Sequence, residues 1–208
     1  MDKLYKGIVE FQQNDYEAHK KLFQNLGRDQ KPHTLFIGCS DSRLVPNLIT
    51  NTLPGELFVV RNIGNLVPPY NENLESYAGT MSAIEYALLQ LKVENIVVCG
   101  HSNCGACQSL YSGEQELQAM PHVKKWLELL RPVKERVKNK LPNADFAQRE
   151  WLTEQINIVQ QMANLLSYPF IKDKYKAGEI QLHGWYYIIE TGEVYVYNKN
   201  SSRFELIS

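Results

Sequence analysis

Short apolar runs and one segment of helical period alternate along the first half of the chain. The runs HTLFIGC (33–39), ELFVVRN (56–62) and NIVVCG (95–100) predict buried strands. Between the second and third runs, a stripe of apolar residues predicts a helix over residues 74–91. Its members are Leu74, Tyr77, Met81, Ile84, Leu88 and Leu91. Since a strand, a helix and a strand in this order pair in parallel, the pattern predicts an α/β fold with a mostly parallel sheet flanked by helices.

The first 28 residues predict a helical arm. Apolar side chains recur at helical spacing over residues 2–26. Asn14 and Asp15 offer an N-cap in the middle of this segment, so we expect two helices with a bend there. The arm has little else nearby in the sequence to pack on, and we expect it to lie across the main body or across a partner chain.

The second half of the chain predicts long helices followed by a hairpin. One helix is expected over about 121–139, with a break or kink at Pro132, and another over about 143–167, starting at Asn143 or Asp145. Residues 180–198 alternate and predict an antiparallel C-terminal hairpin, with Gly192 at a turn position of positive φ. No repeat or linker interrupts the chain, so residues 1–208 are expected to form a single domain.

Composition and charge narrow the class of protein. The net charge of −1 gives no basic footprint for nucleic acid or an anionic membrane surface. No apolar stretch is long enough to cross a bilayer, and the charged, amphipathic N-terminus is unlike a secretory signal. The four cysteines do not form the dense pattern of a disulfide framework. We therefore expect a cytoplasmic protein with reduced thiols.

Metal-type side chains follow two of the predicted strands. Cys39 and Asp41 come after the first strand, and His101 and Cys104 come after the third. Because the carboxyl ends of neighbouring parallel strands meet at one edge of the sheet, these side chains are expected to lie together. Two thiolates and an imidazole suit zinc, and ligands from separate strand ends favour a catalytic site over a zinc ribbon. Arg43 lies close enough to compete with the metal for Asp41.

A redox motif is the alternative for the same cysteines. Cys104 and Cys107 form a CxxC pair, which in redox proteins often lies at a helix N-terminus after a strand. A redox pair does not need the nearby histidine or the Cys39–Asp41 set, so we favour the metal site and expect Cys107 and Cys99 to be buried core residues. Gly38, Gly100 and Gly105 are expected to allow close backbone approach.

Five motifs in this order resemble the β-class carbonic anhydrases, in particular a bacterial member of their plant-type subgroup. They are CSDSR (39–43), PGELFVVRNIGNLVPP (54–69), AIEYA (83–87), GHSNCGAC (100–107) and HGWYY (183–187). The resemblance implies a zinc lyase that reversibly hydrates carbon dioxide to bicarbonate and a proton, with one Zn²⁺ per chain. It also implies a homodimer or homotetramer in which the N-terminal helices embrace the partner.

The resemblance also implies roles for individual residues. Cys39, His101 and Cys104 match the zinc ligands, and Asp41 and Arg43 match the catalytic dyad. The implied substrate-binding residues, some contributed across the dimer interface, are Gln30, Phe58, Ile63, Tyr86 and Gly105. A second subgroup has an inhibitory bicarbonate site that requires a tryptophan where this chain has Phe36. Although Arg61 and Tyr187 match other members of that site, we expect it to be absent here.

The implied chemistry gives Asp41 two alternatives. If Asp41 ligates zinc, it fills the fourth position and blocks catalysis. If Arg43 holds Asp41, that position stays open for a zinc-bound hydroxide, which attacks carbon dioxide. Two further functions remain open: the same chemistry on COS or CS2, and a zinc-containing structural or regulatory module without turnover.

Overall fold

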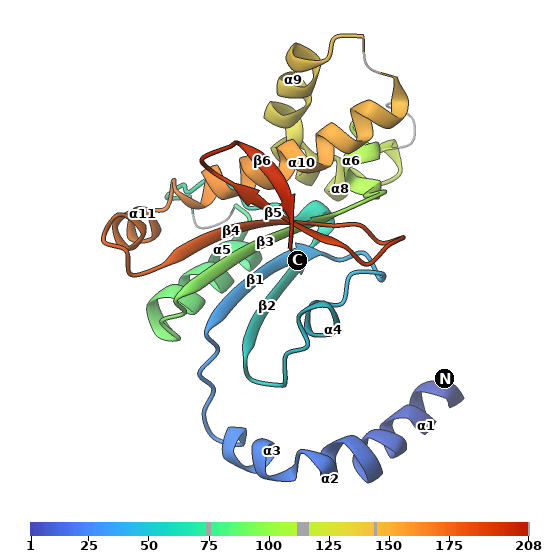
Figure 1. The fold of residues 1–208 in the computed structure, drawn as a ribbon, viewed down its shortest axis with the longest axis vertical. Coiled ribbons are helices and arrows are strands. Elements are labelled where there is room, and N and C mark those ends of the chain that lie inside the picture. Colours follow the sequence, from blue (N-terminus) through green and yellow to red (C-terminus); the bar gives the residue numbers. More distant parts are fainter. Residues whose placement is uncertain (74–75, 112–116, 144, 208) are drawn as a thin grey trace.

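The computed structural model describes residues 1–73, 76–111, 117–143 and 145–207. In this part of the chain a six-stranded sheet has the strand order β2-β1-β3-β4-β5-β6 (Figure 1). The first four strands in this order are parallel, and β5 and β6 are antiparallel additions at one edge. The strands are β1 Thr34–Cys39, β2 Leu57–Asn62, β3 Asn95–His101, β4 Gln181–Tyr187, β5 Val194–Asn198 and β6 Arg203–Leu206. The predicted fold class is therefore confirmed. The prediction that all three strands are buried is wrong for β2, which lies at the edge of the sheet and has no buried residue.

The register of the sheet sets the position of the metal-type side chains. Gly38 of β1 pairs with Cys99 of β3, so the two strands end at nearly the same level. Cys39, the last residue of β1, lies opposite Asn62 of β2. The carboxyl ends of β1 and β3 therefore meet at one edge of the sheet, as the sequence predicted.

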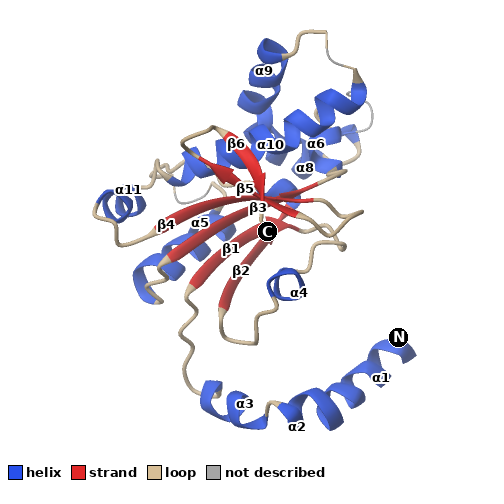
Figure 2. Cartoon of the chain, in the orientation of Figure 1, coloured by secondary structure: helices blue, strands red, loops and turns tan. Residues whose placement is uncertain are grey.

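Helices cover one face of the sheet and extend past its carboxyl edge (Figures 1 and 2). A large apolar core joins β1, β3 and β4 to α5, α10 and α11, and includes Ile37, Ile84 and Ile158. A second cluster lies at the carboxyl edge, where Cys39 and Cys104 pack with residues of α8, α9 and α10. These helices are α5 Ala78–Glu85, α8 Pro121–Leu127, α9 Arg131–Lys140, α10 Phe146–Leu165 and α11 Pro169–Lys176.

Local sequence signals account for several helix boundaries. Asp145 caps α10 and forms a capping box with Gln148, as expected from one of the two predicted start positions. The predicted break in the helix over 121–139 is present, but it is a 3₁₀ turn over Glu128–Leu130, just before the proline. Pro132 itself lies in the first turn of α9, where its missing N–H has no partner to lose. The predicted start of the earlier helix at Leu74 lies outside the described residues. Its described part begins at Ala78, after Tyr77 in the left-handed region with φ 57°.

The opposite face of the sheet carries a smaller apolar cluster of Phe36, Leu44, Val97 and Cys99. The short helix α4 (Pro46–Thr50) lies on this side, and Ile49 from α4 packs against the cluster. Trp185 and Tyr187 of β4 also contact it. This face has a thinner covering than the helical face.

The N-terminal arm stands apart from the sheet (Figure 1). It comprises α1 (Asp2–Glu10), a π-helical turn (Phe11–Asp15), α2 (Tyr16–Ala18) and α3 (Lys20–Leu26), and none of these elements has a buried residue. The predicted helical arm is confirmed, but the predicted restart at Asn14–Asp15 is wrong. Asp15 has helical angles and makes no side-chain cap, whereas the helix is interrupted at His19, with φ −113° and ψ 20°.

The predicted hairpin is present, with β4 and β5 antiparallel and Gly192 at φ 77°. The sequence pattern did not predict α4, α11 or β6. No helix in the described residues is long and apolar enough to cross a membrane.

Candidate metal centre

Three potential metal ligands converge where β1 and β3 end. Cys39 ends β1, His101 ends β3, and Cys104 is the residue before the short helix α6 (Gly105–Gln108). Their ligand atoms all lie within 4.8 Å of one another, and all three residues are buried. Two neighbouring strands thus bring together residues that are 62 positions apart in the sequence, since 101 − 39 = 62.

The protonation of His101 fits a metal ligand. Its Nδ1 lies 2.9 Å from the carbonyl oxygen of Ser102, and because a carbonyl can only accept, Nδ1 must carry the hydrogen. In the neutral ring the Nε2 atom then has a free lone pair, and this atom is buried with no hydrogen-bond partner in the described structure. A buried unpaired nitrogen is costly unless another group binds it, and a metal ion would do so.

The two thiols fit a metal for an electrostatic reason. The neighbouring Cys104 thiol and burial raise the pKa of Cys39 to about 12. The pKa of Cys104 is also raised, first by the adjacent Cys107 thiol. Two buried thiolates are unfavourable side by side without a cation, whereas a metal reverses this balance because thiolates are its preferred form of ligand. The donor set of two sulfurs and one imidazole nitrogen matches the preference of zinc.

Asp41 lies beside this cluster and is bound by Arg43. The guanidinium donates from Nε to Oδ1 at 2.9 Å and from Nη2 to Oδ2 at 2.8 Å, and the Arg43 backbone amide adds a bond of 3.0 Å to Oδ1. These donors hold the pKa of Asp41 well below its usual range. Oδ2 of Asp41 is 3.8 Å from Nε2 of His101. The carboxylate is therefore next to the ligand cluster while Arg43 holds it.

Several residues that support the cluster were missed by sequence reasoning. Arg61 donates to the carbonyl oxygens of Cys39, at 3.0 Å, and Asp41, at 2.6 Å. Arg61 therefore fixes the backbone of this segment. Its match to a residue of the inhibitory bicarbonate site of the second subgroup did not suggest this role. Its position on β2, beside the end of β1, becomes informative only once the strand order is known.

Glu154 supports the cluster from the helical side. It is 2% exposed and accepts hydrogen bonds from the Cys104 backbone amide, at 2.9 Å, and from the Tyr186 hydroxyl, at 2.6 Å. Burial raises the pKa of Glu154 to about 7. Helical spacing places Glu154 on the same face as Ile158 and Leu165, which indicates burial of this carboxyl group but not its contact with Cys104.

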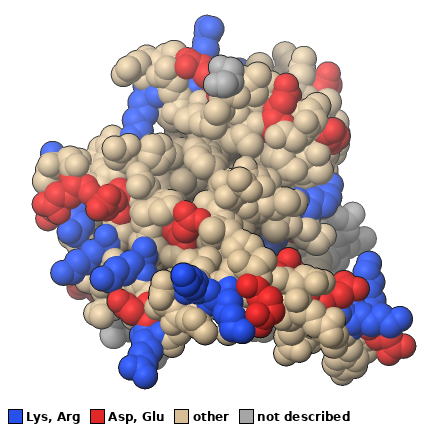
Figure 3. All heavy atoms as spheres, turned by 60° about the horizontal axis from the view of Figure 1, so that its bottom comes forward, with Lys and Arg blue, Asp and Glu red and all other residues tan. Residues whose placement is uncertain are grey.

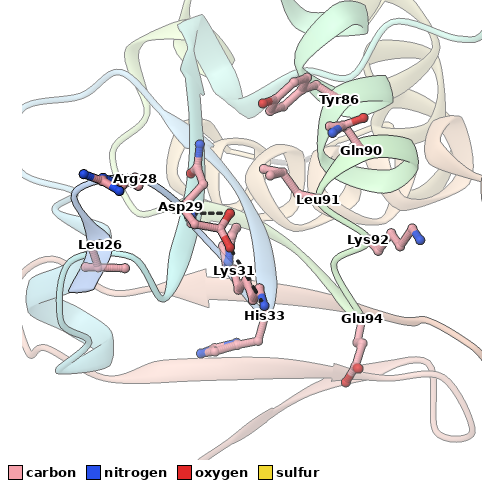
Figure 4. A pocket seen from close by; sticks show the side chains of 12 residues that line it. Leu26, Arg28, Asp29, Lys31, His33, Tyr86, Gln90, Leu91, Lys92 and Glu94 are labelled. Atoms are coloured by element: carbon pink, nitrogen blue, oxygen red, sulfur yellow. Dashed lines mark hydrogen bonds and ion pairs between the residues drawn. The ribbon is translucent and has the colours of Figure 1, made fainter. Parts of the chain in front are cut away.

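The residues expected to bind substrate lie at two different ends of the sheet. Gln30 and Tyr86 line a cavity of about 810 Å³ between the arm and the π-helical turn Tyr86–Gln90, which follows α5. Figure 4 shows this cavity, with Tyr86 labelled. Phe58 packs against Tyr86, with ring centroids 5.9 Å apart. These three residues are near the amino ends of the strands, whereas Cys39 ends β1, a strand that spans about 20 Å.

Ile63 and Gly105 lie near the carboxyl edge instead. Ile63 lines a separate cavity of about 500 Å³ together with Ser40 and Trp126. A side chain added at Gly105 would meet no atom of the chain within 4 Å, so the expected close backbone approach is wrong at this position. It is correct at Gly38 and Gly100, where a Cβ atom would lie 2.7 Å from Leu44 and 2.8 Å from Ile158. One chain therefore does not assemble the five expected substrate-binding residues into one pocket.

The remaining cysteines and Phe36 occupy buried positions. All four cysteines are free, and Cys99 and Cys107 are buried as expected. Phe36 is fully buried and packs edge-on against Trp185, with ring centroids 6.1 Å apart. His122 is exposed and lines the same cavity as Ile63.

A buried thiol–imidazole cluster at the carboxyl edge of a parallel sheet is typical of a metal-dependent α/β enzyme. A family model described as carbonic anhydrase matches residues 34–194. A carbonic anhydrase of Helicobacter pylori is 49% identical over 208 residues, which cover 99% of this chain and 94% of that protein. The solved β-carbonic anhydrase CcaA has a TM-score of 0.95 and 37% identity, and covers 100% of this chain and 99% of its own. The chain therefore belongs to the β-carbonic anhydrase family and is a carbonic anhydrase by enzyme class.

Proposed function

We propose that the chain catalyses the zinc-dependent, reversible hydration of carbon dioxide to bicarbonate and a proton. The observation that carries this proposal is the buried cluster of Cys39, His101 and Cys104, with the lone pair of His101 Nε2 left without a partner. One zinc ion bound there would supply a Lewis acid that generates hydroxide from water near neutral pH. A zinc ion held by these three residues would keep a fourth position for water or substrate, as catalytic zinc sites do.

Asp41 and Arg43 would control access to that fourth position. Two parallel hydrogen bonds hold the Asp41 carboxylate on the guanidinium, which disfavours its rotation onto the metal. The same carboxylate, ionised because of Arg43, is available to accept a hydrogen bond from the nucleophile and orient it toward substrate. Without Arg43, the carboxylate would be free to become a fourth ligand and close the site.

The substrate pocket would be completed by a second copy of the chain. Gln30, Phe58 and Tyr86 lie at the amino end of the sheet and are remote from the cluster of their own chain. A dimer that places this group beside the partner's Ile63 and Gly105 would combine an amide donor with apolar walls for carbon dioxide. Two β-carbonic anhydrases of Sordaria macrospora, described as tetrameric, include a structure 30% identical to this chain with a TM-score of 0.75, covering 93% of this chain and 91% of that one. A homodimer or tetramer is consistent with this relative.

The same residues support a proposal for the cellular setting and the subgroup. Four free thiols, two of them proposed as metal ligands, favour a reducing compartment, and we assign the enzyme to the cytoplasm. Phe36, buried against Trp185, leaves no tryptophan at the position that an inhibitory bicarbonate site requires. Together with Gln30, it supports assignment to the plant-type subgroup.

Stopped-flow measurement of carbon dioxide hydration, combined with metal analysis, tests the proposal. We expect one zinc per chain, loss of hydration after chelation, and recovery on addition of zinc. Cys104→Ala should lose both metal and activity, whereas Cys99→Ala, which removes a buried thiol outside the cluster, should retain both. Hydration by metal-free Cys104→Ala would contradict the proposal. Turnover of COS or CS2 without hydration of carbon dioxide would contradict the proposal and favour the alternative in which the same chemistry acts on COS or CS2.

A further inference from the structure

The loop that carries two of the three proposed ligands, residues 101–104, is bound to the connection after β4. The Ser102 backbone amide donates to the Tyr187 carbonyl at 2.9 Å, and the Ile189 amide donates to the Ser102 hydroxyl oxygen at 3.0 Å. The Ser102 hydroxyl in turn donates to Oε2 of Glu190 at 2.9 Å. The segment between β4 and β5 therefore fixes Ser102 directly next to His101.

Glu190 also binds the next residue of this loop. Its Oε1 accepts a hydrogen bond from Nδ2 of Asn103. The pKa of Glu190 is below its usual value, first because its own backbone amide and then the Ser102 hydroxyl donate to it, so the carboxylate is ionised at neutral pH. Asn103 has φ 55°, a left-handed conformation that is uncommon outside glycine and needs support from its surroundings. Glu190 supplies part of this support.

Asn103 then contacts the proposed catalytic dyad. Its carbonyl oxygen accepts a hydrogen bond of 3.0 Å from Nη2 of Arg43, the same nitrogen that donates to Oδ2 of Asp41 at 2.8 Å. The Arg43 side chain is 45% exposed, so few packing contacts limit its rotation. The Asn103 carbonyl is therefore an important third point of attachment, and its direction depends on the left-handed Asn103 backbone.

We propose that Glu190 is a positioning residue for the Asp41–Arg43 dyad, acting through the Asn103 carbonyl. This inference rests on the proposed role of the dyad in carbon dioxide hydration. If the Glu190 carboxylate is removed, the Asn103 backbone can relax from its left-handed conformation and turn its carbonyl away. Arg43 then loses its third attachment, and Asp41 is held by a guanidinium with more freedom to move. Glu190 touches neither the metal ligands' side chains nor the reacting atoms, so it is a positioning residue only.

The test compares Glu190→Ala with Glu193→Ala, a control on the same connection whose carboxylate binds Thr191 and Tyr195 instead of the metal-site loop. We expect Glu190→Ala to lower kcat/KM for carbon dioxide about tenfold. This is the lower end of the 10- to 100-fold range that is typical when a residue supporting a metal site is replaced. Glu190→Gln, which keeps one acceptor oxygen, should lie between Glu190→Ala and wild type. Zinc retention against a chelator should not change, because the three ligands are intact. A crystal structure of Glu190→Ala should show the Arg43–Asn103 bond lost.

A double-mutant cycle separates this path from a general effect on folding. Asn103→Gly removes the side chain that binds Glu190 but tolerates φ 55°, and the double variant with Glu190→Ala should be no worse than Glu190→Ala alone. The proposal is overturned if Glu190→Ala and Glu193→Ala have equal kcat/KM, or if the Arg43–Asn103 bond persists in the Glu190→Ala crystal. Absence of hydration by the wild type would instead refute the proposed function, and the crystal comparison would still decide whether Glu190 positions Arg43.

Discussion

At the scale of single residues, Asp41 is the side chain whose partner decides what the cluster can do. It lies 3.8 Å from the unpaired nitrogen of His101, yet three hydrogen bonds from Arg43 hold it. The Asp41 and Arg43 side chains are 18% and 45% exposed, and ion pairs that reach solvent contribute little to stability. The pair is therefore better explained by control of the site than by stabilisation of the fold.

Replacement of Arg43 tests this view. Arg43→Ala should lower kcat/KM for carbon dioxide about 10- to 100-fold, the range for residues that support a metal site. The free energy of unfolding should change by less than about 1 kcal/mol, because the pair is partly exposed. Stopped-flow hydration and urea denaturation measure the two effects. Arg43→Lys is the matched control: it keeps the charge but loses the planar fork, and we expect it to recover little activity. Full activity of Arg43→Lys would show that charge alone is sufficient.

His183 on β4 gives a prediction for pH dependence. Burial, and then the charge of Lys199, lower the pKa of His183 below its ordinary value of about 6.5. The unfolded chain therefore takes up this proton first as the pH falls below about 6.5, so stability due to neutral His183 is present above that pH and is lost below it. The unfolding free energy of wild type should fall more steeply between about pH 6.5 and 5 than that of His183→Gln. Urea titrations at several pH values measure this difference, and His19→Gln, in the exposed arm, should follow wild type.

At the scale of elements, α10 holds the segment after β2 through a row of buried amides. Asn157 donates to the Gly64 carbonyl at 3.0 Å, Gln161 accepts from the Val67 amide at 2.8 Å, and Asn164 donates to the Val67 carbonyl at 2.8 Å. Residues four and three positions apart lie on one face of a helix, so the three side chains face the same backbone segment, residues 64–67. This row fixes the segment that contains Ile63.

Gln161→Met exchanges two side chains of similar size, but we expect it to be strongly destabilising. It leaves the buried Val67 amide without an acceptor, which costs about 1–3 kcal/mol. Chemical denaturation measures the loss, and Gln155→Met, at a half-buried position of the same helix, is the control with a smaller expected effect. Equal stability of wild type and Gln161→Met would show that water or a neighbouring group replaces the lost acceptor.

The elements that the sequence predicted best are those with strong local signals. The three predicted strands and the Asp145 cap have an apolar run or a capping residue of their own, although only β1 and β3 are buried. The five-residue helix α4 and the four-residue strand β6 are too short to show a period, so the sequence pattern missed them. Asp15 was a suitable cap by residue type, but the helix passes through it in a π-helical turn. A capping residue permits a helix start and does not require one.

At the scale of the molecule, the arm and the sheet leave apolar surface uncovered. Leu4, Ile8 and Phe11 lie on one side of the arm and are 63%, 53% and 41% exposed. Acidic and basic side chains are intermingled on the face shown in Figure 3, so no single-sign field appears there. We attribute the apolar stripe of the arm to a contact with a second copy, consistent with a substrate pocket completed between two chains.

The prediction of one domain over residues 1–208 stays a prediction.

A double substitution in this stripe tests the assembly. Leu4→Asp with Ile8→Asp should shift the protein from dimer or tetramer toward monomer, because two charges cannot be buried against a partner without large cost. Hydration activity should fall in parallel, since Gln30 and Tyr86 would no longer reach the partner's metal site. Sedimentation analysis gives the assembly state. Gln13→Asp, an exposed position off the stripe, is the control and should behave as wild type. A fully active monomer would contradict the shared pocket.

The sequence by itself determined the α/β class, the positions of three strands, and the types of ligand that follow two of them, but not that β2 is a half-exposed edge strand. These features depend on local periodicity and on residue chemistry, which are legible along the chain. Only the tertiary structure decided that Arg61, Glu154 and Glu190 support the ligand segments, because each of them contacts residues at least 20 positions away. It also showed that Gln30 and Tyr86 lie at the opposite end of the sheet from Cys39. Such contacts follow from strand order and register, and no local pattern encodes them.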